Sequence, residues 1–252
     1  MPMNKLIVYL PCYNEAENIE ALTDLWLEEA PALEARGYLL ELVPVDDKST
    51  DNTLPLITRL AAEHAAVRVI AHQVNRNLGG VLDTAVRDFL QRAGAGDLMC
   101  VMDGDNTHKP AYVHPMLTAL EKGADCVIAS RYQKGAQTHG VPPIRLLLSD
   151  CARLYYTLVL RVPGVRDYTC GYRLYTRAAL EKAAARYGDK LITRQTFSCM
   201  MELLYKLHRC GCRFAEVPFT LRYDDKGGAS KMRVVKTMVD SLSTALKLRL
   251  GR

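Results

Sequence analysis

Short apolar runs alternate with stretches of helical periodicity along the first third of the chain. The runs Leu6 to Leu10, Leu39 to Val45 and Val67 to His72 have the length and the apolar content of buried strands. Between them, Ala16 to Ala35 and Thr53 to His64 repeat apolar residues at the spacing of one helix face. This order predicts a βαβαβ unit with parallel strands.

The same alternation continues through the middle of the chain. It predicts a helix from Gly80 to Ala93, a strand from Leu98 to Met102, a helix around Tyr112 to Glu121 and a strand from Asp125 to Ala129. The sequence therefore predicts an α/β fold of the Rossmann-like type, with a mostly parallel sheet flanked by helices.

A polar loop from Gly135 to Pro143, which we interpret as a lid or acceptor loop, separates this part from a more helical one. One strand is expected there, from Phe214 to Leu221. The expected helices run from Ile144 to about Leu160, from Ala178 onward, from Phe197 to Cys210 and from about Met232. A chain of 252 residues suits one α/β domain, expected over residues 1–230, and a C-terminal helix over residues 231–252.

Composition and charge are those of an ordinary globular protein with a basic C-terminal region. The chain is 49% apolar and 24% charged. Its formal net charge is +5, and the stretch from Arg222 to Arg252 carries most of the local excess. This balance suits a surface that meets phosphates or anionic lipid, and it does not require nucleic acid as a partner.

Cysteine usage and hydropathy bear on the cellular compartment. The eight cysteines show no CxxC spacing, and several lie in apolar runs, which indicates a reducing environment. No segment reaches the roughly 20 apolar residues that span a bilayer, and the chain opens without a secretory signal pattern. We therefore expect a cytoplasmic protein, and peripheral attachment to the cytoplasmic face of a membrane stays open.

Acidic residues follow two of the expected strands. In open α/β sheets, ligands bind beyond the carboxyl ends of the strands. Asp103 and Asp105 flank Gly104 directly after a strand, so their carboxylates can reach one hard cation, Mg²⁺ or Mn²⁺, and the diphosphate that it bridges. Asp46 and Asp47 follow another strand and can accept hydrogen bonds from ribose or base. The alternatives are an acidic surface turn and, for the nearby Thr50 or Asp51, a helix cap.

Together with other short motifs, these residues resemble the family 2 glycosyltransferases of the GT-A fold. The resemblance covers nearly the whole chain and is closest to the dolichol-phosphate or polyprenyl-phosphate mannosyltransferase branch. Its motifs, weak one by one but in the right order, are Pro11-Cys12-Tyr13-Asn14-Glu15, Asp46 to Thr53, Asn77-Leu78-Gly79-Gly80, Asp103-Gly104-Asp105 with His108 and Pro110, Ser130-Arg131-Tyr132, Asp167 to Arg173, Glu216-Val217-Pro218-Phe219 and Arg222 to Lys231.

The resemblance implies roles for individual residues. It implies that the donor nucleoside is held by Pro11, Tyr13, Glu15, Asp46 and Asp47, and that metal and donor diphosphate are held by Asp103 and Asp105. It implies that the acceptor phosphate is bound by Arg131, Arg145, Arg222 and Lys231. The planar guanidinium of the three arginines can take a phosphate with two hydrogen bonds. Asp105 and Arg131 are thereby candidate catalytic residues. Glu202 lies near the position where inverting relatives carry a catalytic acid group, although an ionised phosphate acceptor hardly needs a general base.

The sequence departs from the family pattern in the segment Tyr187 to Thr196, which looks individual, and at three further places. Thr107 stands where Gln is common, Cys170 stands where Ser is common, and Gly79-Gly80 stands where Leu-Gly is common. These departures concern the identity of donor and acceptor more than the class of reaction.

The C-terminal stretch has the pattern of an amphipathic helix. Such a helix either packs its apolar stripe on the domain or lies on an anionic membrane surface, and the pattern leaves both open. Its apolar positions are Val235, Met238, Val239, Leu242, Ala245 and Leu246, with Lys236, Asp240 and Lys247 on another face.

From the resemblance we expect a metal-dependent inverting glycosyltransferase. It would move a hexose, mannose being favoured, from a nucleoside-diphosphate sugar to a polyprenyl or dolichyl phosphate at a membrane surface, with peripheral binding or a separate membrane partner delivering the lipid. Transfer to a soluble natural product, polysaccharide or protein stays open, as does a non-catalytic nucleotide-sugar-binding protein. A dinucleotide-dependent oxidoreductase is excluded, because no GxGxxG follows the first strand.

Overall fold

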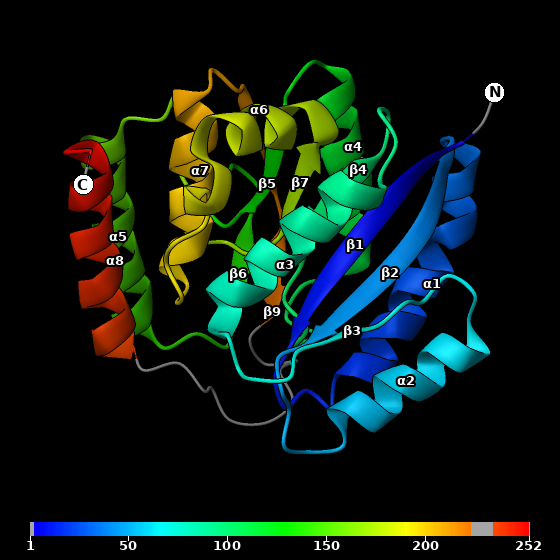
Figure 1. Cartoon of the computed structure of the whole chain (residues 1–252). Helices are drawn as coiled ribbons and strands as arrows, with labels where there is room; N and C mark the ends of the chain where they lie inside the picture. The colour runs from blue at the N-terminus through cyan, green and yellow to red at the C-terminus, as the bar shows by residue number, and fades with distance from the viewer. Residues whose placement is uncertain (1–2, 223–233, 252) are drawn as a thin grey trace.

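The fold is built on a mixed seven-stranded sheet with helices on both faces (Figure 1). It comes from a computed structural model that describes residues 3–222 and 234–251, with only the backbone of residue 145 and residues 234–238. The sheet has seven strands in the order β3-β2-β1-β4-β7-β5-β8, and a separate two-stranded sheet pairs β6 with β9. All pairings are parallel except those of β7. The expected α/β class with a mostly parallel sheet is confirmed.

The strands of the described residues are short, apart from the first two. They are β1 (Asn4–Cys12), β2 (Tyr38–Asp46), β3 (Ile70–Ala71), β4 (Leu98–Val101), β5 (Cys126–Ser130), β6 (Gln137–His139), β7 (Arg173–Thr176), β8 (Phe214–Pro218) and β9 (Thr220–Arg222).

The helices of the described residues connect these strands. They are α1 (Ile19–Ala35), α2 (Thr53–Glu63), α3 (Asn77–Arg92), α4 (Val113–Glu121), α5 (Pro143–Leu160), α6 (Arg177–Tyr187), α7 (Ser198–Arg209) and α8 (Val234–Arg249), with the 3₁₀ turns η1 (Pro110–Tyr112) and η2 (Gly188–Lys190). None of them is long and apolar enough to cross a membrane.

The structure differs from the expectations at three strands. β7 was not expected: it is a four-residue strand whose pattern shows no alternation, and it runs antiparallel between β4 and β5. The stretch expected as one strand from Phe214 to Leu221 is divided, since β8 joins the main sheet while β9 pairs with β6. The strand β6 itself lies inside the loop expected from Gly135 to Pro143.

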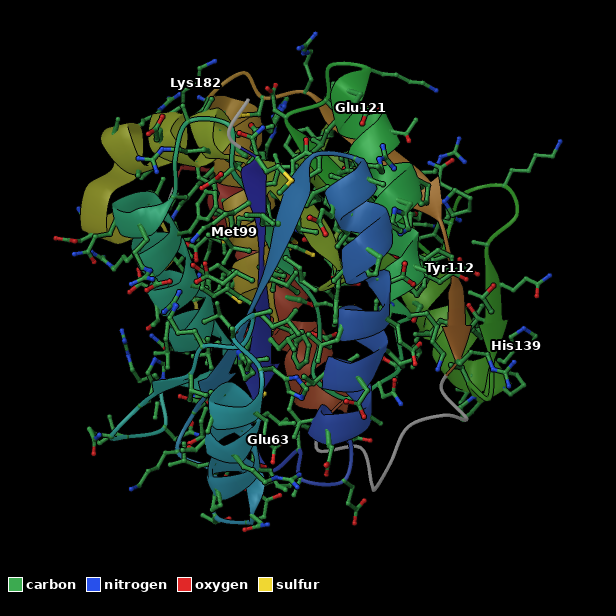
Figure 2. All side chains as sticks on the ribbon, turned by 90° about the vertical axis from the view of Figure 1, so that its right-hand side faces the viewer. Glu63, Met99, Tyr112, Glu121, His139 and Lys182 are labelled. Atoms are coloured by element: carbon green, nitrogen blue, oxygen red, sulfur yellow. The ribbon has the colours of Figure 1, made fainter. Side chains whose placement is uncertain are left out.

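The order of the strands positions the site. From β1 the chain moves outward to β2 and β3, and then crosses back to place β4 on the other side of β1. A crevice forms where the direction reverses, beyond the carboxyl ends of β1 and β4. These two strands lie in the hydrophobic core, where Met99 is fully buried between the helical layers (Figure 2).

Two helices form an outer layer at one end of the molecule. The C-terminal helix α8 packs beside α5 and against α7, far along the sheet from α1 and α2 (Figure 1). Tyr155 and Tyr156 of α5 hold α8 through hydrogen bonds to Leu242 O and Ser241 Oγ, at 3.1 Å and 2.5 Å. One side of α8 is therefore packed on the domain. This agrees with the first of the two interpretations of the amphipathic pattern, in which the apolar stripe packs on the domain.

Candidate functional site

A pocket of about 440 Å³ lies at the crevice predicted by the strand order. This volume is within the range of small-molecule sites. The carboxyl ends of β1 and β4, the residue after β2, the start of α3 and one aromatic residue before α7 line it: Pro11, Cys12, Tyr13, Glu15, Asp47, Asn75, Asn77, Leu78, Val81, Asp103, Gly104, Asp105 and Phe197. The structure thus brings together six of the seven residues expected to hold the donor, and Asp46 lies directly beside them.

The turn after β4 directs both aspartates of the Asp103-Gly104-Asp105 motif to this pocket. The turn is closely packed: a Cβ on Gly104 would lie 2.8 Å from Pro11 O, and a Cβ on Gly171 would lie 2.6 Å from Asp103 Oδ1. Thr107 donates its hydroxyl to Asp105 Oδ1 at 2.7 Å. A side chain at either glycine would displace the turn. The position of the two carboxylates therefore depends on glycine at both Gly104 and Gly171.

These two carboxylates fit a hard divalent cation. Mg²⁺ and Mn²⁺ prefer oxygen ligands, and in phosphate-transfer sites they are commonly held by one or two carboxylates with the remaining positions filled by substrate oxygens and water. No group of three or more His, Cys, Asp and Glu that could hold a metal is present in residues 3–222 and 234–251. Asp103 and Asp105 are the two carboxylates of the turn that would hold such an ion.

Asp47 is the centre of a hydrogen-bonded group at one side of the pocket. Its Oδ1 lies 2.8 Å from His72 Nδ1 and accepts the Arg76 amide at 2.8 Å, while Asn75 Nδ2 donates to its carbonyl at 2.9 Å. The neighbouring Asp46 is 1% exposed and accepts the Ser49 amide through Oδ2. Its buried Oδ1 has no hydrogen-bond partner among the described residues, so this atom keeps an unused acceptor next to the pocket-lining Asp47.

Arg131, which is partly exposed, pairs with a buried aspartate beside the site. Its Nε and Nη2 donate to the two oxygens of Asp167 at 2.8 Å and 2.7 Å, and its amide donates to the same carboxylate. Asp167 is fully buried. Burial by itself would raise the pKa of Asp167, but the charge and hydrogen bonds of Arg131 hold this pKa below its ordinary value. The pair fixes the direction of the Arg131 guanidinium.

A neutral histidine joins this ion pair to the aspartate turn. His108 is buried, stacks on Phe219, and lies 3.2 Å from Thr107 Oγ1 and 3.7 Å from Cys170 Sγ. Burial lowers the pKa of His108 to about 4, so the ring is uncharged at neutral pH. The Cys170 amide donates to Asp167 Oδ1 at 3.1 Å. A continuous set of contacts therefore links Asp105 with Arg131.

The structure describes only part of the other three cations that are expected to bind the acceptor phosphate. The amide of Arg222, at the end of β9, donates to Thr107 O at 3.4 Å, which brings the end of this strand to the aspartate turn. Arg145 is in the first turn of α5, and its side chain is outside the described part. Lys231 is outside the described residues altogether.

Glu202 lies in α7 and is 1% exposed. It accepts the amides of Thr193 and Arg194 at 2.8 Å and 2.9 Å, and its Oε1 lies 2.6 Å from Lys206 Nζ. It is not one of the residues that line the pocket. Its role as a catalytic group stays a prediction, and its contacts are those of a residue that holds a loop.

Several pocket residues were not expected from the sequence. Asn75 and Val81 flank the start of α3, and Phe197 comes from the segment before α7. Asn75 follows a strand end, which is the general signal for a site in this type of sheet. Phe197 carries no such signal, because its place depends on how α7 packs.

Comparison with protein-family models matches residues 7–183 to the family described as glycosyl transferase family 2. A polyprenol monophosphomannose synthase of Mycolicibacterium smegmatis is 31% identical over 231 residues, covering 92% of this chain and 82% of that protein. A dolichol-phosphate mannosyltransferase of Pyrococcus furiosus is 30% identical over 224 residues, covering 88% of this chain and 58% of the longer relative.

An undecaprenyl-phosphate mannosyltransferase of Micrococcus luteus is 28% identical over 231 residues, covering 90% of this chain and 87% of that protein. Among solved structures, glucosyl-3-phosphoglycerate synthase of Mycobacterium tuberculosis, in complex with Mn²⁺, UDP and glucosyl-3-phosphoglycerate, has a TM-score of 0.67 at 20% identity. That match covers 98% of this chain and 80% of the other chain. At this identity, the match shows that the two chains share a fold and nothing more.

Proposed function

Since this chain belongs to glycosyl transferase family 2, we propose that it is an inverting, metal-dependent enzyme that moves a hexose, with mannose favoured, from a nucleoside-diphosphate sugar to a polyprenyl phosphate. Binding of the sugar donor is supported by one observation: the same pocket is lined by Tyr13, Glu15, Asp47, Asp103 and Asp105. The acceptor half is supported by the printed names of relatives, which are polyprenol-, dolichol- and undecaprenyl-phosphate enzymes.

In the proposed reaction, an oxygen of the lipid phosphate attacks the anomeric carbon as the bond from that carbon to the donor diphosphate breaks. The nucleoside diphosphate leaves with the bonding electron pair, and the configuration inverts. The acceptor phosphate is already ionised, so no side chain has to remove a proton from it. A bound Mg²⁺ or Mn²⁺ would supply Lewis-acid stabilisation of the leaving diphosphate.

The residues of the chain would then act mainly by positioning and charge. Asp103 and Asp105 would hold the cation, and its charge would stabilise the diphosphate. Asp47, itself fixed by His72 and the Arg76 amide, orients the nucleoside. Arg131, whose direction is fixed by Asp167, binds the acceptor phosphate.

The acceptor side also offers a surface for a lipid. Tyr132 follows Arg131, donates its hydroxyl to Ser149 O of α5 at 3.3 Å, and has the Arg153 guanidinium 4.9 Å above its ring. The cation proposed to bind the lipid phosphate is therefore next to α5. Eight of the thirteen exposed large apolar side chains in the described residues lie on α5, on α8 or directly after α8: Ile144, Leu146, Leu147, Leu154, Leu158, Val239, Leu246 and Leu250.

We therefore propose that α5 and α8 together rest on the membrane that contains the acceptor. Apolar side chains on helices with basic neighbours bind anionic bilayer surfaces, and Arg153, Lys247 and Arg249 supply the charge here. This arrangement delivers the lipid without a separate membrane protein.

The proposal is tested first by nucleotide binding. The melting temperature of the purified protein is measured with GDP, UDP, GDP-mannose and UDP-glucose, each with and without MnCl₂, because a ligand that binds the folded state raises it. We expect a manganese-dependent rise with the nucleotides of one base. The absence of a rise with every nucleotide, in a folded sample, would contradict donor binding. Transfer of labelled sugar from the matching donor to a short polyprenyl phosphate then tests the acceptor.

A further inference from the structure

One wall of the donor pocket comes from the segment Thr193 to Ser198, which we call the wall segment. Phe197 of this segment lines the pocket. On its other side the segment abuts the start of α3, where the Gly79 amide donates to Gln195 O at 3.0 Å. A Cβ on Gly79 would lie only 1.8 Å from Arg194 O, so α3 and the wall segment touch backbone to backbone. The shape of the pocket thus depends on where this segment is held.

Glu202 of α7 holds the first half of the wall segment. It accepts the Thr193 and Arg194 amides, and the Thr193 hydroxyl at 2.6 Å. Lys206, one turn further along α7, lies 2.6 Å from the same carboxylate and balances its charge in this buried position. The contacts attach the segment to the helix that follows it.

Asp240 of α8 holds the second half. Its Oδ2 accepts the hydroxyl of Thr196 at 2.6 Å and that of Ser198 at 2.7 Å, one on each side of Phe197. These two hydrogen bonds lower the pKa of Asp240, which means that the ionised carboxylate is the form that makes them. Asp240 is thus a direct side-chain connection from the C-terminal helix to residues flanking the pocket-lining Phe197.

We propose that Asp240 is a positioning residue for the donor: it fixes Phe197 through the hydroxyls of Thr196 and Ser198, and it couples the C-terminal helix to the donor pocket. The inference rests on the proposed function, since it takes the pocket to be the nucleotide site. Val239, the neighbour of Asp240, is 59% exposed on the surface proposed to meet the membrane. Coupling between two sites is reciprocal, so an effect of membrane contact at α8 on donor binding would be matched by an equal effect of donor binding on membrane contact.

The test compares nucleotide affinity of variants that break and restore this connection. Asp240→Ala removes two hydrogen bonds to an ionised acceptor and is expected to raise the Kd for GDP or UDP, measured by calorimetry with MnCl₂, about fivefold to tenfold. Asp240→Asn retains an oxygen that can accept from both hydroxyls and is expected to stay within about twofold of the wild type. Asp24→Ala, which removes an exposed carboxylate from α1, is the matched control.

A second series removes the same bonds from the wall segment. Ser198→Ala should weaken nucleotide binding by itself, and in the Ser198→Ala, Asp240→Ala double variant the two effects should be clearly less than additive, because the partners share one interaction. Additive effects, or an unchanged Kd in Asp240→Ala, would overturn the inference while leaving the proposed function intact. Failure of the wild type to bind either nucleotide would overturn the proposed function, and the inference with it.

Discussion

Among single residues, Asp105 is the first to test, because it lines the pocket and its carboxylate is oriented by the hydroxyl of Thr107. Asp105→Ala is predicted to lower turnover at least about 100-fold, since a carboxylate that holds the cation contributes several kcal/mol to stabilisation of the leaving group. The same variant should lose the manganese-dependent rise in melting temperature with nucleotide, while its melting temperature without ligand changes little. Asp189→Ala, at a carboxylate whose side chain is 93% exposed, is the control. Full activity in Asp105→Ala would contradict the metal role.

A second prediction at this scale concerns Asp167, which is fully buried and accepts from Arg131, Thr169 and Cys170. Asp167→Asn leaves the Arg131 charge without its counterion. We expect a loss of about 3 kcal/mol in the free energy of unfolding at pH 7, measured by urea denaturation. Asp150→Asn, which breaks an exposed pair with Arg153, should cost less than about 1 kcal/mol.

The effect of Asp167→Asn should also depend on pH. The pKa of Asp167 in the folded protein is below its ordinary value of about 3.9, so the ion pair stabilises fully above that pH. The contribution is lost as the pH falls through the lowered pKa, because the carboxylate is then protonated in both states. The difference in the free energy of unfolding between wild type and Asp167→Asn should therefore become smaller below about pH 4. A difference that is constant from pH 7 to pH 3 would show that the charge of Asp167 is not what stabilises the fold.

At the scale of elements, the contact between α3 and the wall segment gives the next prediction. Gly79→Ala places a methyl group 1.8 Å from Arg194 O, so either helix or segment must move. We expect a loss of about 2 kcal/mol in unfolding free energy and weaker nucleotide binding by calorimetry, because Phe197 moves with the segment. Gly94→Ala adds a methyl group at ordinary contact distance, 3.6 Å from Asp97 Oδ2, and should change neither quantity appreciably.

Elements with a clear period were predictable from the sequence, and those without one were not. The strand β1 and the helices α1, α2 and α3 follow apolar patterns that extend over many residues, and their observed bounds differ from the expected ones by a few positions. The strand β7 has four residues and gains its place by pairing with β4 and β5 on both sides. Such a strand is defined by its neighbours, so its own residues carry little signal.

The candidate site divides in the same way. Tyr13, Asp47 and Asp105 follow strands, and the carboxyl ends of parallel strands converge, so the sequence was sufficient to group them. The importance of Gly79, Phe197 and Asp240 to the pocket depends on the packing of α3, α7 and α8, which short-range patterns do not encode. The candidate cations were identified from the resemblance to the family. The structure added the buried Asp167, which orients Arg131.

At the scale of the whole molecule, apolar exposure is concentrated on one end. Ile144, Leu147, Leu154 and Leu158 recur along α5 at helical spacing and are each about 60% exposed, while the opposite side of the same helix packs through Tyr156 and Leu160. An exposed apolar surface of this kind, beside basic residues, is typical of an interaction site. The proposed occupant is the bilayer that contains the acceptor lipid.

The corresponding prediction uses Leu158→Glu, which places a charge in this surface at a position that is 61% exposed. Transfer of an exposed leucine into the bilayer contributes on the order of 1–2 kcal/mol, and a carboxylate is repelled by anionic lipid, so binding to phosphatidylglycerol-containing liposomes should fall at least about tenfold in sedimentation assays. The melting temperature and nucleotide affinity without lipid should stay unchanged. Val74→Glu introduces the same charge at a side chain that is 66% exposed in the connection between β3 and α3, and this variant should bind liposomes like the wild type. If both variants bind like the wild type, the α5 and α8 surface is not the one that meets the membrane, and the lipid reaches Arg131 by another face of the molecule.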